Sequence, residues 1–441
     1  MKVRGLLIAA VLLAALSGVL WWSNKKKAAE EGKPDTSATP KLVDIPQTQV
    51  TKVSIAHKGS PAVVLEKSGG QWKITAPEQY GADQDTVNSL LSSLNPLNAD
   101  KLVEDHPSDL GQFGLKDPSL TVAVTTTSGK TTTILAGDDL PTGGSSYAEL
   151  AGDSKVYTIP SYAKSGLDKS VNDLRDKRLL TFDSDKITRV DLTAKGKTVE
   201  FGKNNLNEWQ ILAPKPMRAD GLQVDELVRK LKEARMDLSV SADDAKKAAA
   251  AFASGTPVAE AKVTDAAGTQ TLTVKKDKAG DYYAKSSAAA GVYKVTSDLG
   301  TGVDKTVDDF RNKKLFDFGF NEPNHIDIQD GPKSYSLQRN GEDWFQNGKK
   351  LDNLSVQNLI DKLRDLTAAK FVDSGFGTPS IHVNIVSNDG KKTEKVAFAA
   401  SGADFIGQRE GETSLYSVDG KTMKDIEQAA SDVKPAQEKK K

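Results

Sequence analysis

The chain of 441 residues contains no cysteine. Disulfide bonds, cysteine-ligated zinc, iron–sulfur clusters, thiol catalysis and a lipid-modified N-terminal cysteine are therefore excluded. Exported proteins often avoid cysteine because stray thiols are oxidised outside the cytoplasm, although chance alone can leave it out of a chain rich in alanine and lysine. The missing residue thus excludes several chemistries and is only a weak indication of compartment.

Aromatic residues are scarce, and neither sign of charge predominates. Phe, Trp and Tyr make up 6% of the chain, and 60 basic side chains face 60 acidic ones. Binding to nucleic acid needs concentrated positive charge, so this balance predicts that nucleic acid is not a partner. The length leaves room for roughly three domains of about 100–150 residues, each large enough to bury its own core.

Nucleotide-binding and zinc-binding motifs are also missing. Gly-Lys-Thr occurs at 129–131, 196–198 and 420–422. A P-loop needs a further glycine five residues before the one in this triplet, and Val124, Asp191 and Leu415 stand there instead. We interpret all three triplets as hairpin turns. The four histidines are scattered along the chain: His57, His106, His325 and His382. They form no pair four residues apart, so no zinc site is predicted.

No catalytic pattern is recognisable either. A Ser-His-Asp triad can draw its members from anywhere in a chain, but no Gly-x-Ser-x-Gly elbow supports one here. The acidic pieces Asp83-Gln84-Asp85 and Asn388-Asp389-Gly390 lack the spacing and the closing Glu of an EF-hand. We therefore predict that the protein is not an enzyme and has no catalytic residues, no cofactor-binding residues, no metal site and no cofactor.

One long apolar run stands at the N-terminus. Residues 5–22 carry no charge, Lys2 and Arg4 precede them, and lysines follow. Eighteen such residues are just enough to cross a bilayer as a helix, and Trp21-Trp22 suits the headgroup interface. The alternative is a cleaved signal peptide with Ala15-Leu16-Ser17 as its site, but that site lies inside the run. We predict a membrane anchor at 1–22, in a single-pass inner-membrane protein whose body is periplasmic or otherwise extracytoplasmic.

The two ends of the remaining chain look irregular. Residues 23–46 are charged, contain proline and lack apolar periodicity, which predicts a flexible stalk. Residues 433–441 (VKPAQEKKK) predict a disordered tail.

The body between these ends is a repeat marked by Trp72, Trp209 and Trp344, which are 137 and 135 residues apart. After each Trp comes an amphipathic helix with apolar residues at i, i+3, i+4 and i+7. These residues are Val87/Leu90/Leu91/Leu94, Val224/Leu227/Val228/Leu231 and Val356/Leu359/Ile360/Leu363. Two short alternating segments before each Trp predict a β-hairpin. We interpret each Trp as a core residue; the alternative is a set of three ligand-stacking aromatics.

An aspartate precedes each of the three helices. Asp83 and Asp220 follow their Trp by 11 residues, and Asp352 follows Trp344 by 8. A carboxylate at this place can accept backbone N–H groups of the first turn, so helix capping is the expected role. A catalytic set would need the three carboxylates close together, whereas the repeat predicts them in separate units.

Later landmarks complete each unit. A Phe followed by Pro leads into a new strand, and a Tyr-containing strand comes next: Val156-Tyr157, Val292-Tyr293 and Leu415-Tyr416. Near-copies at 173–183 and 309–319 close the first two units, and the third lacks this closure. The predicted units are 47–183, 184–320 and a truncated 321–432, with an extra helix around the Ala-rich 245–253. The predicted fold class is α+β: three tandem repeats, each a mostly antiparallel sheet with a helix packed on one face, behind an N-terminal transmembrane helix.

These features, in this order, resemble the bacterial domain-of-unknown-function family 4340. The resemblance is carried by the Trp, by Ala82-Asp83 and Ala219-Asp220, by FGLKDP at 113–118, by the Val-Tyr strand and by the closure at 174–177. It extends over about residues 47–320; the third unit departs from it by its shorter Trp-to-Asp spacing and its missing closure. The resemblance implies a repeated, membrane-anchored protein with no catalytic residues to carry over. Similar members accompany ABC-transporter components and gliding-motility auxiliary proteins, which implies an accessory role in the envelope.

Three hypotheses for the function follow. The first is a non-enzymatic, membrane-anchored envelope protein that serves as scaffold or adaptor, with the membrane and ABC-transporter or other envelope subunits as partners. The second is a periplasmic module that binds a glycan or peptide in a groove between units. Exposed aromatics at a junction would favour it, and buried tryptophans would count against it. The third is a hydrolase, which needs a cleft with convergent carboxylates or an activated serine.

Overall fold

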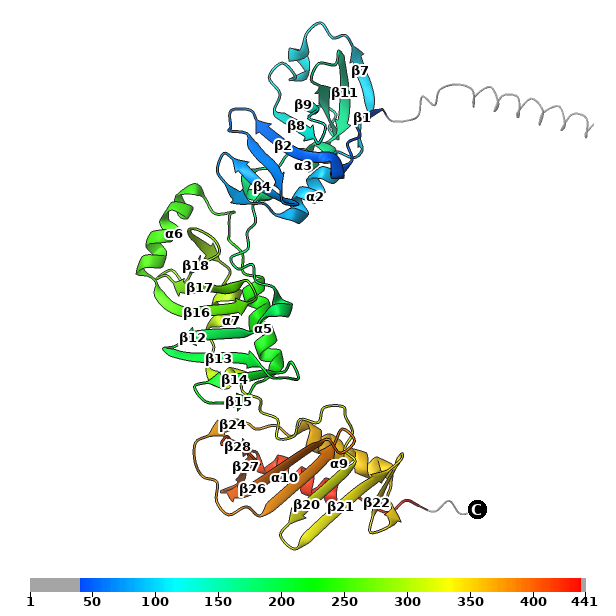
Figure 1. Ribbon diagram of the computed structural model, residues 1–441, viewed down its shortest axis with the longest axis vertical. Coiled ribbons are helices and arrows are strands. Elements are labelled where there is room, and N and C mark those ends of the chain that lie inside the picture. Colours follow the sequence, from blue (N-terminus) through cyan, green and yellow to red (C-terminus); the bar gives the residue numbers. More distant parts are fainter. Residues whose placement is uncertain (1–39, 438–441) are drawn as a thin grey trace, which may run out of the picture. The chain divides into compact units, whose positions relative to one another are not determined.

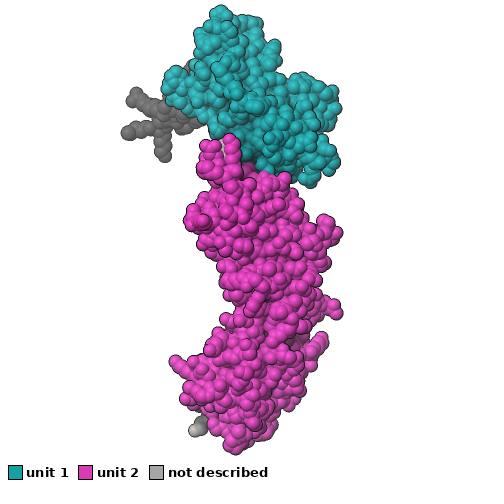
Figure 2. Space-filling view, turned by 90° about the vertical axis from the view of Figure 1, so that its left-hand side faces the viewer, with its two compact units in different colours: residues 1–177 teal, residues 178–441 magenta. Residues whose placement is uncertain are grey.

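Three large antiparallel sheets organise residues 40–437, the part of the chain that the computed structural model describes. Each sheet is the centre of one module, and we call residues 40–177, 178–312 and 313–437 the first, second and third module. The first module belongs to a compact unit that ends at Lys177; the other two form a second unit beginning at Arg178 (Figure 2). Each module has its own buried core.

The first module has a nine-stranded sheet in the order β5-β4-β3-β2-β8-β9-β10-β11-β7 (Figure 1). Its strands are β2 (Val50–His57), β3 (Val63–Ser68), β4 (Gln71–Ala76), β5 (Tyr80–Gly81), β7 (Lys101–Asp105), β8 (Leu120–Thr126), β9 (Thr131–Asp139), β10 (Ser145–Leu150) and β11 (Lys155–Pro160). A separate pair joins β1 (Lys41–Val43) to β6 (Leu97–Asn98). The helices are α2 (Gln84–Ser92), α3 (Ser161–Leu167) and α4 (Val171–Leu174), with 3-10 turns η1 (Gln47–Gln49) and η2 (Leu110–Phe113).

The second module has an eight-stranded sheet in the order β15-β14-β13-β12-β16-β17-β18-β19. Its strands are β12 (Arg189–Ala194), β13 (Lys197–Lys203), β14 (Trp209–Ala213), β15 (Met217–Arg218), β16 (Thr256–Asp265), β17 (Gly268–Lys276), β18 (Tyr282–Ser286) and β19 (Val292–Val295). Its helices are α5 (Gly221–Lys232), α6 (Ala242–Ser254), α7 (Ser297–Val303) and α8 (Val307–Phe310), and η3 (Ser184–Lys186) is a 3-10 turn. Helix α6 lies on the Ala-rich stretch and confirms the extra helix predicted there.

The third module has a nine-stranded sheet in the order β23-β22-β21-β20-β25-β26-β27-β28-β24. Its strands are β20 (His325–Asp330), β21 (Lys333–Asn340), β22 (Asp343–Gln346), β23 (Lys349–Lys350), β24 (Lys370–Val372), β25 (Ile381–Ser387), β26 (Lys392–Ser401), β27 (Asp404–Arg409) and β28 (Leu415–Val418). Helices α9 (Asn353–Asp365) and α10 (Gly420–Ser431) pack against each other. Helix α10, for which the sequence showed no recognised pattern, follows the last strand of its module as the shorter α3 and α7 do in theirs.

The predicted α+β class is wrong, because the chain is mostly β, with 42% of its residues in strands and 23% in helices. Each sheet is built from two antiparallel meanders that meet at a central strand pair, such as β12 and β16. The sequence favoured a mixed class, a mostly antiparallel sheet with a packed helix, because the apolar stripe of the helix is the clearest periodic pattern in each repeat. The many short strands contribute more residues, although each has a weaker pattern.

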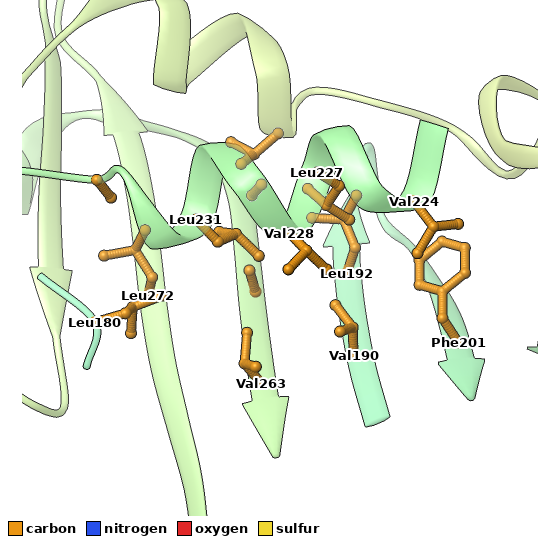
Figure 3. Close-up of a cluster of buried hydrophobic side chains, with 14 of the residues drawn as sticks. Leu180, Val190, Leu192, Phe201, Val224, Leu227, Val228, Leu231, Val263 and Leu272 are labelled. Atoms are coloured by element: carbon orange, nitrogen blue, oxygen red, sulfur yellow. The ribbon is translucent and has the colours of Figure 1, made fainter. Parts of the chain in front are cut away.

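Helix α5 packs the apolar stripe predicted for it against the sheet. Figure 3 shows Val224, Leu227, Val228 and Leu231 directed toward strand residues that include Val263. Helices α2 and α9 bury their matching residues in the same way. The periodicity therefore identified the long helix of each module correctly.

The three tryptophans are core residues, as predicted. Trp72, Trp209 and Trp344 expose only 4%, 7% and 4% of their surfaces, and each belongs to the core of its own module. The indole N–H of Trp209 donates a hydrogen bond of 2.8 Å to Asp225 of α5. Burial of this kind leaves no ring face for a ligand, so the three aromatics do not form a stacking site.

The aspartates before the long helices are N-caps, which confirms the predicted role. Asp83 and Asp352 accept N–H groups of Thr86 and Ser355 at 2.9 Å, and Asp220 accepts two N–H groups of α5. The three carboxylates lie in three different modules. Their chemistry is therefore local, and each satisfies backbone donors that the first helical turn leaves unpaired.

Replacing Asp220 with alanine should lower the free energy of unfolding of the second module by about 1 kcal/mol, because the cap is lost. Asp220→Asn keeps a side-chain oxygen at the same place and should cost a few tenths of a kcal/mol. Urea unfolding followed by far-UV circular dichroism measures both. Equal losses in the two variants would contradict capping as the role of this side chain.

Each module takes its first core residues from the segment that precedes its sheet. Leu179, Leu180 and Phe182 lie in the second core, and Leu315, Phe316 and Phe318 lie in the third. Leu42 and Val43 do the same in the first module. In Figure 3, Leu180 lies beside Leu272 at the end of α5.

This arrangement corrects three boundaries. The second and third cores begin at about residues 179 and 315 rather than at the predicted 184 and 321. The predicted stalk, 23–46, ends too late, because residues from Leu42 onward are part of the first core. The segments looked like the ends of the preceding units because they follow the closing helices α4 and α8 directly in sequence.

A short backbone contact closes every module beside its long helix. The N–H of Asp83 donates to Leu174, that of Asp220 to Phe310, and that of Asp352 to Lys434, at 2.7–2.8 Å. In the third module the bridge pairs Leu351 with Pro435. The predicted disordered tail, 433–441, therefore begins too early: residues up to Ala436 hold a place in the fold, and residues 438–441 lie outside the described part.

The predicted membrane anchor at 1–22 lies outside the described residues. Among residues 40–437, no helix has the length and apolar character needed to cross a bilayer. The predicted single-pass, inner-membrane localisation therefore has no support among the described residues.

Candidate functional site

An open cleft of about 590 Å³ lies on the third module and is the first candidate site. Its floor is the face of the sheet turned away from α9 and α10, since Ile381, Val383 and Ile385 point into the core and the residues between them point outward. His382 and Asn384 of β25 are two of these outward residues. Asp327, Lys395, Ala397 and Gln408 also line the cleft, together with Phe376 from the loop before β25.

The same face is covered in the first module. There η2 and the residues after it bring Phe113 and Leu115 onto the sheet, where they form a small second core with Val156. The rings of Phe113 and Tyr147 meet edge to face at 5.0 Å. Leu135 packs against this cluster.

The register of the strands explains why the cleft stays open in the third module. Leu135 pairs with Thr121 in the first sheet, and Ala397 pairs with His382 at the matching place in the third. A leucine is thus replaced by an alanine on the floor. The loop that carries Phe376 (373–380) is also shorter than the first module's segment 106–119, so fewer apolar side chains are available to cover the sheet.

A polar cluster centred on Asp327 forms one end of the cleft. The Asp327 carboxylate accepts hydrogen bonds from the Ser336 hydroxyl at 2.7 Å and the Asn384 amide at 3.2 Å, and the His325 ring lies 2.8 Å from it. Burial alone would raise the pKa of Asp327, but these partners lower it below its ordinary value. Asp327 is therefore held as a carboxylate.

A network of charged side chains forms the other end and joins the second module to the third. Arg218, on the edge strand β15, donates from Nε to the Glu412 carboxylate at 2.8 Å and from Nη2 to the Tyr416 hydroxyl at 3.2 Å. Its Nη2 also donates to the backbone carbonyl of Lys314 at 2.5 Å. Arg409 donates from its own Nε to the same Glu412 oxygen, also at 2.8 Å. One carboxylate thus accepts hydrogen bonds from two guanidinium groups that belong to two modules.

A second arginine of the same edge reinforces this junction. Arg311, which pairs with Ala219 in the closing contact of the second module, donates to the Ser414 hydroxyl at 3.0 Å. Its guanidinium carbon lies 3.3 Å from the ring centroid of Phe371 on β24. Only 11% of the Arg311 side chain and 18% of the Arg218 side chain are exposed. Both arginines are therefore part of an interior contact.

The comparisons with known proteins give the family. A family model described as "Domain of unknown function (DUF4340)" matches residues 72–208 and 209–382, two adjacent regions that together make up more than half of the chain. The chain belongs to the DUF4340 family. No curated protein and no solved structure gave a significant match.

The two DUF4340 regions confirm the resemblance seen in the sequence and the repetition of the domain. They begin at Trp72 and Trp209, so each runs from the Trp of one module into the next. The second region ends at His382, on the floor of the cleft. The DUF4340 repeat is thus shifted against the structural modules, because the first strands of each module, such as β12 and β13, precede its Trp.

The four histidines of this DUF4340 chain are divided between the first and third modules. His57 is 2.6 Å from Asp168 in the first module, and His106 lies on the same module beside Asp105. His325 and His382 both lie on the third sheet. Within residues 40–437, no three His, Asp or Glu side chains are grouped in a way that could hold a metal ion.

One motif interpretation is wrong. The Gly-Lys-Thr triplets at 129–131 and 196–198 do lie at the turns β8–β9 and β12–β13. The triplet at 420–422 begins helix α10 instead, where Asp419 caps Lys421 and Thr422. The Asp before this triplet, a typical N-cap residue, was the sequence feature that could have identified the helix.

Tyr416 and Arg311 were noted in the sequence only as repeat landmarks, and nothing there predicted the junction in which they take part. Arg218 and Glu412 are 194 positions apart and belong to no motif. The one available indication was the place of Arg218 on an edge strand, two residues before the helix cap Asp220. Gly81 stands at this place in the first module and Lys350 in the third.

Acid should weaken the contact between the second and third modules. Burial would raise the pKa of the Glu412 carboxyl, but Arg218, Tyr416 and Arg409 lower it below the ordinary value of 4.5. A carboxyl with a lowered pKa stabilises the folded state above its unfolded-state pKa, and this contribution is lost as pH falls through the folded-state value. We therefore expect the loss below pH 4.5.

The Glu412→Gln variant tests this expectation. It should be less stable than the unaltered chain at neutral pH, and it should lose less further stability on acidification, because the titrating group is gone. Urea unfolding at a series of pH values measures both effects. Glu410→Gln is the matched control, since Glu410 is 68% exposed beside Lys395. An unchanged acid dependence in Glu412→Gln would contradict the assignment.

Proposed function

We propose that this protein is a non-enzymatic scaffold or adaptor that binds partner proteins through its antiparallel-sheet modules. The observation that supports this most is the junction between the second and third modules, where Arg218 and Arg311 are buried against the third module. Interfaces between domains often allow relative motion, and buried charge-assisted hydrogen bonds restrict it. A scaffold needs such restriction, because it must present separate surfaces at a fixed spacing.

The segment that passes between these modules supports the same function. Leu315, Phe316 and Phe318 leave the closing contact of the second module and enter the core of the third. The connection is therefore a buried strap rather than a flexible linker. The junction between the second and third modules is thus stabilised by the covalent connection, by apolar burial and by the arginine contacts.

The partner class proposed for the first test is the ABC transporter, which the family resemblance suggests. A tagged full-length chain is to be captured from gently solubilised source cells, and the co-purifying proteins quantified by mass spectrometry. We expect a constant set of partners in fixed ratio, with transporter subunits among them. Arg218→Met, which loosens the junction, should lower the recovery of partners that contact both modules. Repeated recovery of the chain alone would contradict the proposal.

The cleft of the third module favours a second candidate function, the binding of a glycan or peptide. Its volume lies in the range of small-molecule sites, and its lining combines Phe376 with polar side chains such as Gln408. The buried tryptophans count against a site made from those rings, so the candidate rests on this cleft alone. The site also lies within one module and not in a groove between units.

Filling the cleft tests this second candidate. Ala397→Leu restores the leucine found at the matching place of the first module and should occupy the floor without disturbing the core. Isothermal titration with soluble oligosaccharides and extended peptides should give saturable heat for the unaltered chain, and the variant should give none. The candidate fails if no probe binds, or if the variant binds as well as the original.

A further inference from the structure

The third module shows how a face of this fold receives a neighbour. Strands β24 and β28 pair Phe371 with Tyr416, and these two residues with Glu412 form what we call the receiving face. Arg311 lies over Phe371, and Arg218 contacts both Glu412 and Tyr416. Tyr416 is only 2% exposed.

The first module carries the same face. Strands β7 and β11 pair Leu102 with Tyr157, in the register that pairs Phe371 with Tyr416. Asp153 precedes Tyr157 by four residues, as Glu412 precedes Tyr416. We call Leu102, Asp153 and Tyr157 the first face.

The turns before the two tyrosines also match in detail. The N–H of Asp153 donates to the Leu150 carbonyl at 2.8 Å, and the N–H of Glu412 donates to the Arg409 carbonyl at 3.2 Å. A glycine with positive φ precedes each acid, Gly152 at 89° and Gly411 at 79°. The backbone therefore places an acid, a tyrosine and an apolar edge residue in the same arrangement on both modules.

The first face is more exposed to solvent than the receiving face. Leu102 is 45% exposed and Val103 beside it is 37% exposed, which makes them two of the few large apolar side chains in solvent among the described residues. Strand β7 is the last strand of its sheet, so its outer edge has no partner strand in residues 40–437. Exposed edges with apolar side chains favour association.

We propose that the first face binds another protein that presents arginine side chains from an extended edge, as the second module presents Arg218 and Arg311 to the third. This inference rests on the proposed adaptor function and names the chemistry of one partner. Asp153 supplies the carboxylate for a guanidinium. Glu104 and Asp105 on β7 add negative charge near Leu102, beside the positive charges of Lys101 and of Lys155, which pairs with Asp105. The partner's arginine stem packs on Leu102 in the way that Arg311 packs on Phe371.

Outside the second module, no module edge of this chain carries both arginines. The first module has Arg175 in place of Arg311 but Gly81 in place of Arg218. Lys350 stands in the third module where Arg218 stands in the second, and Pro435 stands in place of Arg311. Neither residue offers a guanidinium. The occupant is therefore a different protein, and self-association is an outcome that would contradict the proposal.

Site-specific photo-crosslinking in source cells tests the proposal with the full-length chain. A photoreactive phenylalanine analogue replaces Leu102 in one variant and Tyr162 in another. Tyr162 is the matched control, because it lies on the same module and is 80% exposed. We expect a discrete adduct from position 102 at about ten times the yield from position 162, and a cross-linked partner peptide with arginine next to the attachment point.

Charge reversal supplies the second measurement. Asp153→Arg should lower the adduct yield at position 102 by about tenfold, and Leu102→Glu should lower capture of the same partner to a similar degree. Thermal unfolding of both variants checks that the first module stays folded. The proposal falls if position 102 gives no specific adduct, if the adduct is this chain itself, or if charge reversal has no effect. Partner capture that is unaffected by these variants would leave the adaptor function standing and remove only this inference.

Discussion

Replacing Phe316 with alanine should cost the third module about 3–5 kcal/mol, which is a large part of the stability of a domain this size. Phe316 is 1% exposed and is among the largest fully buried side chains of the protein. Its removal leaves a cavity in the core of the third module, and the surrounding side chains can fill this cavity only in part. The loss should fall on the third module, although Phe316 follows the closing helix α8 of the second module by only a few residues.

Hydrogen exchange measured by mass spectrometry can separate the modules. Amides of β25 should lose protection in Phe316→Ala, whereas amides of β16 in the second module should keep most of theirs. Phe320→Ala is the matched control, because Phe320 is 95% exposed and its loss should change stability by no more than about 0.5 kcal/mol. Greater loss of protection in β16 than in β25 would assign this segment to the second module and contradict the description of the strap.

The parts of the fold that could be predicted from sequence are those governed by local patterns. The apolar spacing of α5 and the cap residue Asp220 are both decided within a few residues of chain. The burial of Trp209 could also be predicted, because it ends a strand whose alternation marks a half-buried sheet. Each of these features needs no information about distant residues.

The features that were missed depend on contacts between distant residues. Leu315 and Phe316 look like the end of the second repeat in sequence, and only the packed structure shows that the third core takes them in. The closing contact at Pro435 is made by the backbone, so it has no side-chain pattern to recognise. The predicted fold class was wrong for a related reason. Each of the many short strands gives a weak sequence pattern, but together the strands contain more residues than the helices.

The candidate site was out of reach for two physical reasons. The cleft exists because Ala397 is small and the loop carrying Phe376 is short, and a missing side chain leaves no motif. The junction depends on Arg218 meeting Glu412 across 194 residues of chain. Charged residues are common on solvated surfaces, so an arginine destined for an interior contact cannot be distinguished in sequence from the many others.

Replacing Arg218 with methionine should destabilise the junction between the second and third modules by about 2–3 kcal/mol. Methionine keeps much of the side-chain volume but removes the guanidinium, so Glu412 loses one of its two cationic partners while it stays 21% exposed. Removing one partner of a buried ion pair is costly because the remaining charge is left uncompensated. The full loss of a partner typically costs about 3–5 kcal/mol. We expect a smaller loss here because Arg409 still contacts Glu412 at 2.8 Å. Calorimetry of the full-length chain should show the second and third modules unfolding further apart in temperature.

Two comparisons separate charge from geometry at this position. Arg218→Lys keeps the charge but cannot contact Glu412, the Lys314 carbonyl and Tyr416 together, so it should recover only part of the loss. Arg229→Met on α5 is the matched control, because Arg229 is 50% exposed and its ion pairs should contribute less than about 1 kcal/mol. If Glu412→Gln costs as much in the Arg218→Met background as in the unaltered chain, the two side chains are not coupled and the network does not hold the modules together. A clearly smaller cost would place the coupling energy on this single contact between modules.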